Sequence, residues 1–203
     1  MARVVQAAER RTVSYDDFLT TCDGIHAEWV AGHVVRMPPA SRRHQQVRDF
    51  LFSVLQLYVE QRELGRVISA PFQMKTGARL AGREPDLLFV ATDNLARLKP
   101  TYLDGPADLA VEVVSPESRI RDRCDKLGEY EQGGVGEYWI VDPDERQADF
   151  YVRSPQGRYD ARRADARGIY RSPTVPGLWI KETWLWQDPP PKVLSVLRRL
   201  GVV

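Results

Sequence analysis

Two acidic residues beside apolar segments are the first in this sequence that could do chemistry. Glu112 stands inside the run 109–114, whose other members are all apolar, and Asp86 comes directly before the apolar run 87–90. A carboxylate in a buried strand is costly unless it pairs with a cation or binds a metal ion. If the two strands are neighbours, both carboxylates can share one face of the sheet and hold a magnesium ion, which keeps several waters for phosphate oxygens. A structural ion pair at Glu112 is the alternative, and the residues alone leave it open.

A lysine on the following helix is the third candidate. A buried stripe of Ile120, Cys124 and Leu127 is expected there, and the rotation of 100° per residue places Lys126 on its flank. The ammonium of Lys126 can then extend over the end of the sheet, to within about 5 Å of a Glu112 oxygen, and stabilise charge on a phosphate. A flank lysine can equally be solvated, and the pattern does not decide.

The elements that must position these residues mix helical and strand periodicities. In the core the order is helix, three strands, helix, strand, which predicts an α/β sandwich with a mixed sheet. The expected helices cover 15–21, capped by Ser14 and Asp17, then 41–63 and 115–132, and the expected strands cover 26–30, 33–37, 66–75, 86–92, 107–115, 135–141 and 147–152.

Length and composition limit the class of protein. A chain of 203 residues is long enough for a sizeable core, so we expect a single domain over 1–203. Its 43% hydrophobic and 28% charged residues are typical of a globular protein and exclude a disordered or fibrous one. No apolar run reaches the ~18 residues of a membrane span and the N-terminus has no apolar signal core, so we expect a cytoplasmic protein. Cys22 and Cys124 lack the spacing of a disulfide framework or a zinc cluster, and we expect both to be small buried residues.

Charge is distributed unevenly along a chain whose net charge is only +1. The segment 36–48 holds four arginines and His44 without an acid, and the segment 158–171 holds five arginines against two acids. Such clusters permit a phosphate-binding surface, although ordinary solvated faces look the same. Neither a Gly-x-Ser-x-Gly elbow nor a glycine-rich phosphate loop is present.

Several stretches join the candidate residues in one pattern. They are Glu84-Pro85-Asp86-Leu87, the run 109–118 (LAVEVVSPES), Asp122 with Lys126-Leu127 and Tyr130, and the run 134–142 (GVGEYWIVD). On these motifs the chain resembles the Uma2 family of restriction endonucleases, within the PD-(D/E)XK nuclease superfamily. The similarity runs from the hairpin 28–32 through His44 to 175–178 and is most specific over 111–142.

The resemblance implies a restriction-endonuclease-like αβββαβ core with a mixed central sheet, preceded by an N-terminal β-hairpin. It implies a catalytic Mg²⁺, with Mn²⁺ as an alternative ion, bound by Asp86 and Glu112. It also implies that Lys126 is the superfamily's catalytic lysine, moved to the helix because Val114 fills the usual position two residues after the glutamate.

Two further residues match the family and join the catalytic candidates. His44, on the first long helix, can orient a phosphate or a carboxylate, or can lie at the surface. Glu28, in the hairpin, can complete the metal shell or hydrogen-bond His44.

The function expected from these observations is metal-dependent hydrolysis of DNA phosphodiester bonds by an endodeoxyribonuclease, with DNA as partner, no membrane partner and a homodimeric state. A catalytically silent nuclease-like fold that binds nucleic acid or protein is the alternative, because function belongs to the site and not to the fold. The candidate DNA-binding residues are Arg42, Arg43, Arg48 and Arg123.

Overall fold

A six-stranded mixed sheet forms the centre of the computed structural model, which describes residues 12–22, 25–116 and 118–202. In sheet order the strands are β11 (Tyr159–Arg162), β10 (Gln147–Arg153), β9 (Glu137–Asp142), β8 (Leu109–Val113), β6 (Leu87–Ala91) and β3 (Gly65–Ser69). Strands β8 and β9 are parallel and the other neighbours are antiparallel, so the predicted mixed sheet is confirmed.

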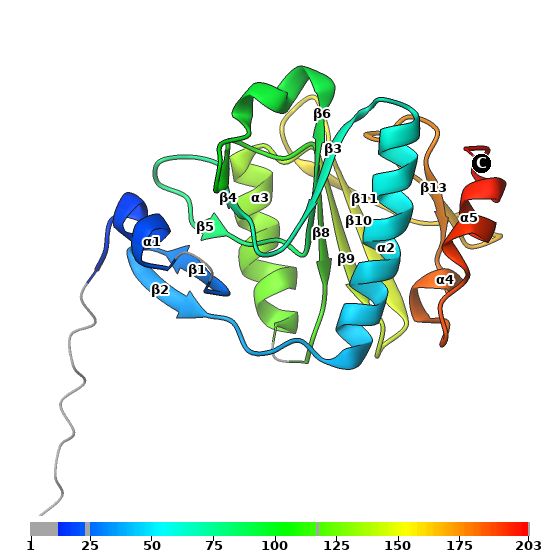
Figure 1. Ribbon diagram of the computed structural model, residues 1–203, viewed down its shortest axis with the longest axis horizontal. Coiled ribbons are helices and arrows are strands. Elements are labelled where there is room, and N and C mark those ends of the chain that lie inside the picture. The colour runs from blue at the N-terminus through cyan, green and yellow to red at the C-terminus, as the bar shows by residue number, and fades with distance from the viewer. Residues whose placement is uncertain (1–11, 23–24, 117, 203) are drawn as a thin grey trace, which may run out of the picture.

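One face of this sheet is covered by the long helix α2 (Arg42–Gln61), as Figure 1 shows. The predicted amphipathic pattern is confirmed, because the apolar stripe from Val47 to Val59 is buried against Leu87, Val111 and Trp139. Ser41 caps the helix by accepting a hydrogen bond from the His44 backbone N–H.

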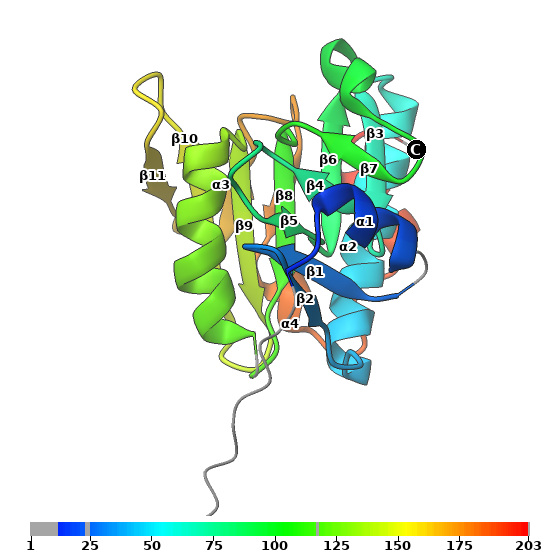
Figure 2. The same cartoon turned by 90° about the vertical axis from the view of Figure 1, so that its left-hand side faces the viewer.

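The opposite face is shared by a second, smaller sheet and the helix α3 (Leu127–Gly133), which lie side by side in Figure 2. The hairpin predicted at its edge is confirmed, and so is the short helix α1 (Tyr15–Thr21), whose N-cap Ser14 accepts from the Asp17 N–H. The strands of the smaller sheet are, in order, β2 (His33–Arg36), β1 (Ala27–Val30), β5 (Gly82–Arg83), β4 (Gln73–Lys75) and β7 (Tyr102–Asp104).

The single strand predicted over 66–75 is wrong. The structure divides it into β3 and β4, which belong to different sheets and are joined through Pro71. β3 is the edge strand of the central sheet, and its pairing with β6 ends after Ala70, whose N–H donates to the Asp86 carbonyl, where the fixed φ of Pro71 redirects the chain. The break lets β4 cross to the smaller sheet.

The helix after β8 presents a different face from the one predicted. Ile120 is 79% exposed and Cys124 is exposed, so the expected apolar stripe is wrong; Cys22, too, is only half-buried. The buried side chains are Asp122, Lys126 and Tyr130, at positions i, i+4 and i+8. This helix contains the π-helical segment η2 (Arg121–Lys126) and continues as α3 (Leu127–Gly133). Acidic groups of other elements surround Lys126, so a polar face is the one that packs inward.

The C-terminal part packs outside α2, at the right of Figure 1. Buried Glu137 of β9 holds it by accepting hydrogen bonds from Tyr170 (2.7 Å) and Ser172 (2.6 Å) as well as from Trp139.

The described residues include no helix that is both long and apolar enough for a membrane span. The N-terminal segment 1–11, which we expect to lack a signal core, lies outside them. The remaining elements are η1 (Thr92–Arg97), β12 (Ile169–Arg171), β13 (Trp179–Lys181), α4 (Thr183–Trp186) and α5 (Val193–Arg199).

Candidate active site

The strand register brings Asp86 and Glu112 next to each other at one end of β6 and β8. Strands β6 and β8 pair with Leu87 opposite Val111, so the next position along brings Asp86 opposite Glu112. The Val113 N–H donates to Asp86 Oδ2 over 2.7 Å, which fixes the aspartate against β8 beyond the last ladder pair. Residues directly opposite each other in antiparallel strands have Cβ atoms roughly 4.5–5.5 Å apart. The register therefore supports the expectation that the two carboxylates are neighbours.

Lys126 is enclosed by three carboxylates and is not solvated. Its Nζ lies 2.7 Å from Glu112 Oε1, 3.0 Å from Glu28 Oε1 and 3.3 Å from Asp122 Oδ1, and the residue is 1% exposed. Lys126 donates a hydrogen bond to Glu112 Oε1, whereas its contact with Asp122 Oδ1 is an ion pair without a hydrogen bond. The expectation that Lys126 reaches Glu112 is confirmed as geometry, although by burial within a charged cluster and not by extension from a flank. Tyr130 OH donates to the same Glu112 oxygen over 3.0 Å.

Glu28 connects Lys126 to a second cation. Its other oxygen, Oε2, accepts from Arg83 Nη1 over 2.8 Å, and Arg83 also binds Glu129 through Nε and Nη2. Burial alone would raise the pKa of Glu28, but Lys126 and Arg83 outweigh it and lower the pKa to about 2. Both oxygens are thus occupied by protein donors, and the expected alternative of a hydrogen bond to His44 is not what the structure shows.

His44 binds Asp86 instead. Its Nε2 lies 3.1 Å from Asp86 Oδ2, with both side chains 12% exposed, so the histidine is not a surface residue. His44 comes from the first turn of α2, which Ser41 caps, and the cap places the imidazole over the start of β6. Of the two alternatives for His44, the structure shows contact with a carboxylate.

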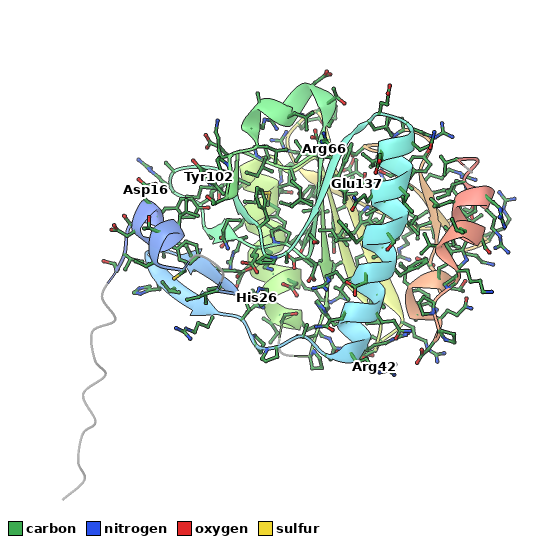
Figure 3. All side chains as sticks on the ribbon, in the orientation of Figure 1. Asp16, His26, Arg42, Arg66, Tyr102 and Glu137 are labelled. Atoms are coloured by element: carbon green, nitrogen blue, oxygen red, sulfur yellow. The ribbon has the colours of Figure 1, made fainter. Side chains whose placement is uncertain are left out.

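His44, Asp86, Glu112, Asp122 and Lys126 line a pocket of about 540 Å³. Its wall includes His26 and the link 37–41 between β2 and α2; Figure 3 labels His26 and, at the start of α2, Arg42. Asp86 Oδ1 and Glu112 Oε2 accept no hydrogen bond from any described residue, while the second oxygen of each is held by the protein. Each carboxylate therefore has one oxygen available at the pocket.

A divalent ion with oxygen ligands fits this donor set. Asp86 and Glu112 are hard ligands on stiff strands, which suit magnesium. Within 12–22, 25–116 and 118–202, no group of three or more His, Cys, Asp or Glu residues is placed to hold a metal ion together. Two protein carboxylates would therefore leave the remaining coordination positions to water and substrate, as is usual for magnesium.

The pocket carries more negative charge than Lys126 balances. Burial raises the pKa of Glu112 well above its usual range, Lys126 only partly offsets this, and Asp122, Asp86 and Glu28 add to the rise. Burial would lower the pKa of Lys126, but Glu112, Glu28 and Asp122 outweigh it and raise that pKa. An additional cation at Glu112 would therefore lower the electrostatic free energy of the pocket.

The candidate DNA-binding arginines fall in different surroundings, and Arg43 is the one that lines the pocket. Arg42 is exposed, 3.8 Å from Asp188. Arg48 pairs with Asp49 at 2.8 Å, and Arg123 pairs with Asp149 of β10.

Sequence reasoning missed two pocket residues next to each other on η2, Arg121 and Asp122. The spacing of four residues between Asp122 and Lys126 was the available signal, because i and i+4 are neighbours on a helix. The sequence does not distinguish Arg121 from Arg119 and Arg123, which lie two positions away on either side. Only the structure shows that these two form ion pairs with carboxylates outside the pocket.

Comparison with known proteins agrees with this architecture. The model of the Uma2 family, described as "Putative restriction endonuclease", matches residues 15–183. The crystal structure of a "putative nuclease belonging to DUF820" from Anabaena variabilis ATCC 29413 is similar, with a TM-score of 0.69 and 18% sequence identity over 86% of this chain and 97% of that one. That likeness shows a shared nuclease-like fold. A search of curated protein sequences finds no significant match. Because the family model covers most of the chain, this protein belongs to the Uma2 family.

Proposed function

We propose that this protein is a magnesium-dependent endonuclease that hydrolyses DNA phosphodiester bonds, with Mn²⁺ as an alternative ion. The observation that supports the proposal is that Asp86 and Glu112 line one pocket, each with an oxygen that accepts no hydrogen bond from the described residues, and that Lys126 lies 2.7 Å from Glu112. The order α2, β3, β6, β8, η2 with α3, and β9 fits the αβββαβ core of a PD-(D/E)XK nuclease in a single domain over 1–203.

The protein's own residues orient the two metal ligands in this proposal. Lys126 and Tyr130 hold one oxygen of Glu112 and turn the other toward the pocket. The Val113 N–H and His44 do the same for Asp86. A magnesium ion bound there would supply Lewis-acid chemistry, polarising a phosphate oxygen and lowering the pKa of a water molecule.

Lys126 acts in this proposal mainly through Glu112. Its ammonium group lies between the carboxylates of Glu112, Glu28 and Asp122, so its first role is to fix Glu112 and Glu28 relative to each other. Its positive charge also lies next to the position where a phosphate would gain negative charge during hydrolysis.

DNA is the proposed substrate, and Arg43 at the pocket is the first candidate for a backbone contact, which positions the duplex without reading its sequence. A homodimer would present two such pockets to the two strands. Sedimentation of the protein with and without duplex DNA tests this part separately.

Cleavage of supercoiled plasmid in Mg²⁺, Mn²⁺, Ca²⁺ or EDTA tests the activity. The parent protein should nick or linearise the plasmid in Mg²⁺ or Mn²⁺ only, and Glu112→Gln should not. Glu137→Gln is the matched control, because Glu137 is an equally buried strand carboxylate that does not line the pocket. Plasmid binding without cleavage under every condition would instead favour the non-cutting, nucleic-acid-binding alternative.

A further inference from the structure

Arg121 is a half-buried cation of the pocket whose Nε makes no hydrogen bond within the described residues. It belongs to η2 and lines the pocket beside Asp86 and Glu112. Its side chain is 22% exposed, yet Nε is enclosed and donates to no atom of the described residues. The ion pair from Nε to Asp122 Oδ1 spans 4.0 Å, which exceeds hydrogen-bonding distance, and Asp122 Oδ1 is likewise buried without a hydrogen bond. A buried donor on a charged group is unfavourable until it finds an acceptor.

The neighbouring arginines of the same helix both donate hydrogen bonds to carboxylates, so the unpartnered Nε is particular to Arg121. Arg119 Nε donates to Asp142 Oδ2 over 2.9 Å, and Arg123 donates to Asp149. Both partners lie on β9 and β10, outside the pocket wall. Strands β9 and β10 therefore supply carboxylates to Arg119 and Arg123, whereas Arg121, which lies between them in the sequence, lines the pocket.

The other cations of the pocket are already engaged. Lys126 donates to Glu112 and forms ion pairs with Glu28 and Asp122. Arg43 Nη1 donates to the Gln187 carbonyl over 3.3 Å, and His44 Nε2 contacts Asp86. Within the described part of the chain, Arg121 is the pocket cation whose guanidinium makes no hydrogen bond to protein.

A guanidinium group presents a planar fork of donors that matches two oxygens of a phosphate. We propose that Arg121 binds a backbone phosphate of the nucleic acid beside the Asp86–Glu112 pair. This inference rests on the proposed function and adds to it the residue that receives the phosphate, distinct from Lys126 and from the surface arginines. Arg121 is a substrate-binding residue in this assignment, because it touches the phosphate directly.

Fluorescence anisotropy with a labelled DNA duplex in Ca²⁺, measured over a series of salt concentrations, tests the inference without requiring cleavage. Arg121→Ala should weaken binding about tenfold or more at low salt. It should also reduce the slope of log affinity against log salt by about one, as expected for one lost phosphate contact. Arg121→Lys should keep the salt slope but bind more weakly than the parent, because a point charge replaces the fork.

Arg119→Ala is the matched control, since Arg119 is on the same helix and pairs outside the pocket. It should bind DNA with the parent's affinity and slope. Arg121→Gln, which keeps most of the length without the charge, is measured alongside so that a failure of Arg121→Ala to fold does not decide the result.

The outcomes separate this inference from the proposed function. Parent-like affinity and slope in both Arg121→Ala and Arg121→Gln overturn the inference, even if the parent cuts plasmid. Weakened binding by these variants supports it, even if the parent cuts nothing and the nuclease proposal fails. A parent protein that binds no DNA overturns both.

Discussion

Lys126 Nζ lies 2.7 Å from Glu112 Oε1, and this ion pair ties the π-helical segment η2 to the buried strand β8. Glu28 and Asp122 also lie on the same ammonium. One ammonium group is therefore shared by three buried carboxylates, of which Glu28 also pairs with Arg83. Removing the lysine leaves negative charge in excess, whereas removing a carboxylate reduces that excess.

Lys126→Ala should destabilise the protein by about 3–5 kcal/mol, because it leaves Glu28, Glu112 and Asp122 buried without their shared cation. Added Mg²⁺ should raise the melting temperature of this variant more than that of the parent, since a bound ion replaces part of the lost charge. Thermal unfolding by circular dichroism with and without Mg²⁺ measures both effects. Equal stabilisation of the two proteins would contradict a metal site next to Lys126.

Lys126→Arg should not restore the parent's properties. The ammonium occupies a space with carboxylate oxygens at 2.7, 3.0 and 3.3 Å, and a larger planar group cannot meet all three in that space. We expect a lower melting temperature than the parent and no plasmid cleavage. Parent-level cleavage by Lys126→Arg would show that the position requires only a positive charge.

Glu112→Gln should remove divalent-ion binding while the fold persists. The neutral amide relieves the cost of a buried charge whose pKa burial raises, and Lys126 keeps Glu28 and Asp122 as partners. Isothermal titration calorimetry with Mg²⁺ measures the loss. Glu137→Gln should retain the parent's affinity because Glu137 lies among Trp139, Tyr170 and Ser172, away from the pocket. Unchanged Mg²⁺ binding by Glu112→Gln would exclude Glu112 as a ligand.

The sequence predicted best those elements whose signal is local. The amphipathic repeat of α2, the apolar run of β8 and the turn at Ala31-Gly32 each specify their own element, and the structure confirms all three. Strand alternation likewise predicted that Asp86 and Glu112 could share a face, which the register supports.

The inward face of the helix after β8 could not be predicted in the same way. Sorting its residues by polarity favours Ile120 and Cys124 as buried, whereas the structure buries Asp122 and Lys126. Their burial depends on Glu28, which comes from a hairpin distant in the sequence. The spacing of four residues places Asp122 and Lys126 on one side of the helix, but it does not say that this side faces inward. The pocket position of Arg121 depends in the same way on residues distant in the sequence.

Electrostatic attraction to the DNA backbone should depend on where the arginines lie. Combined replacement of Arg42, Arg43 and Arg48 by Ala should weaken duplex binding and flatten its salt dependence, with Arg43→Ala alone causing most of the loss because Arg43 lines the pocket. Anisotropy over a salt series in Ca²⁺ measures both. Replacement of Arg162, Arg163 and Arg171, around a different pocket, removes the same charge. Equal losses from the two triple variants would mean that overall charge, not position, controls binding.

Glu28 should make the stability of the fold depend on acid pH. Its pKa is about 2 in the folded protein and about 4.5 as an ordinary glutamate, because Lys126 and Arg83 favour its charged form more strongly than burial disfavours it. A lowered folded-state pKa stabilises the protein above pH ~4.5, and this contribution, roughly 3 kcal/mol, disappears as the pH falls through about 2. The free energies of unfolding of the parent and of Glu28→Gln, measured in urea, should therefore differ most near neutral pH and converge as the pH falls from 4.5 toward 2.

Glu60→Gln, on the exposed side of α2, is the control and should match the parent's free energy of unfolding at every pH. A difference between parent and Glu28→Gln that stays constant with pH would show that the Glu28 carboxylate does not carry this stabilisation.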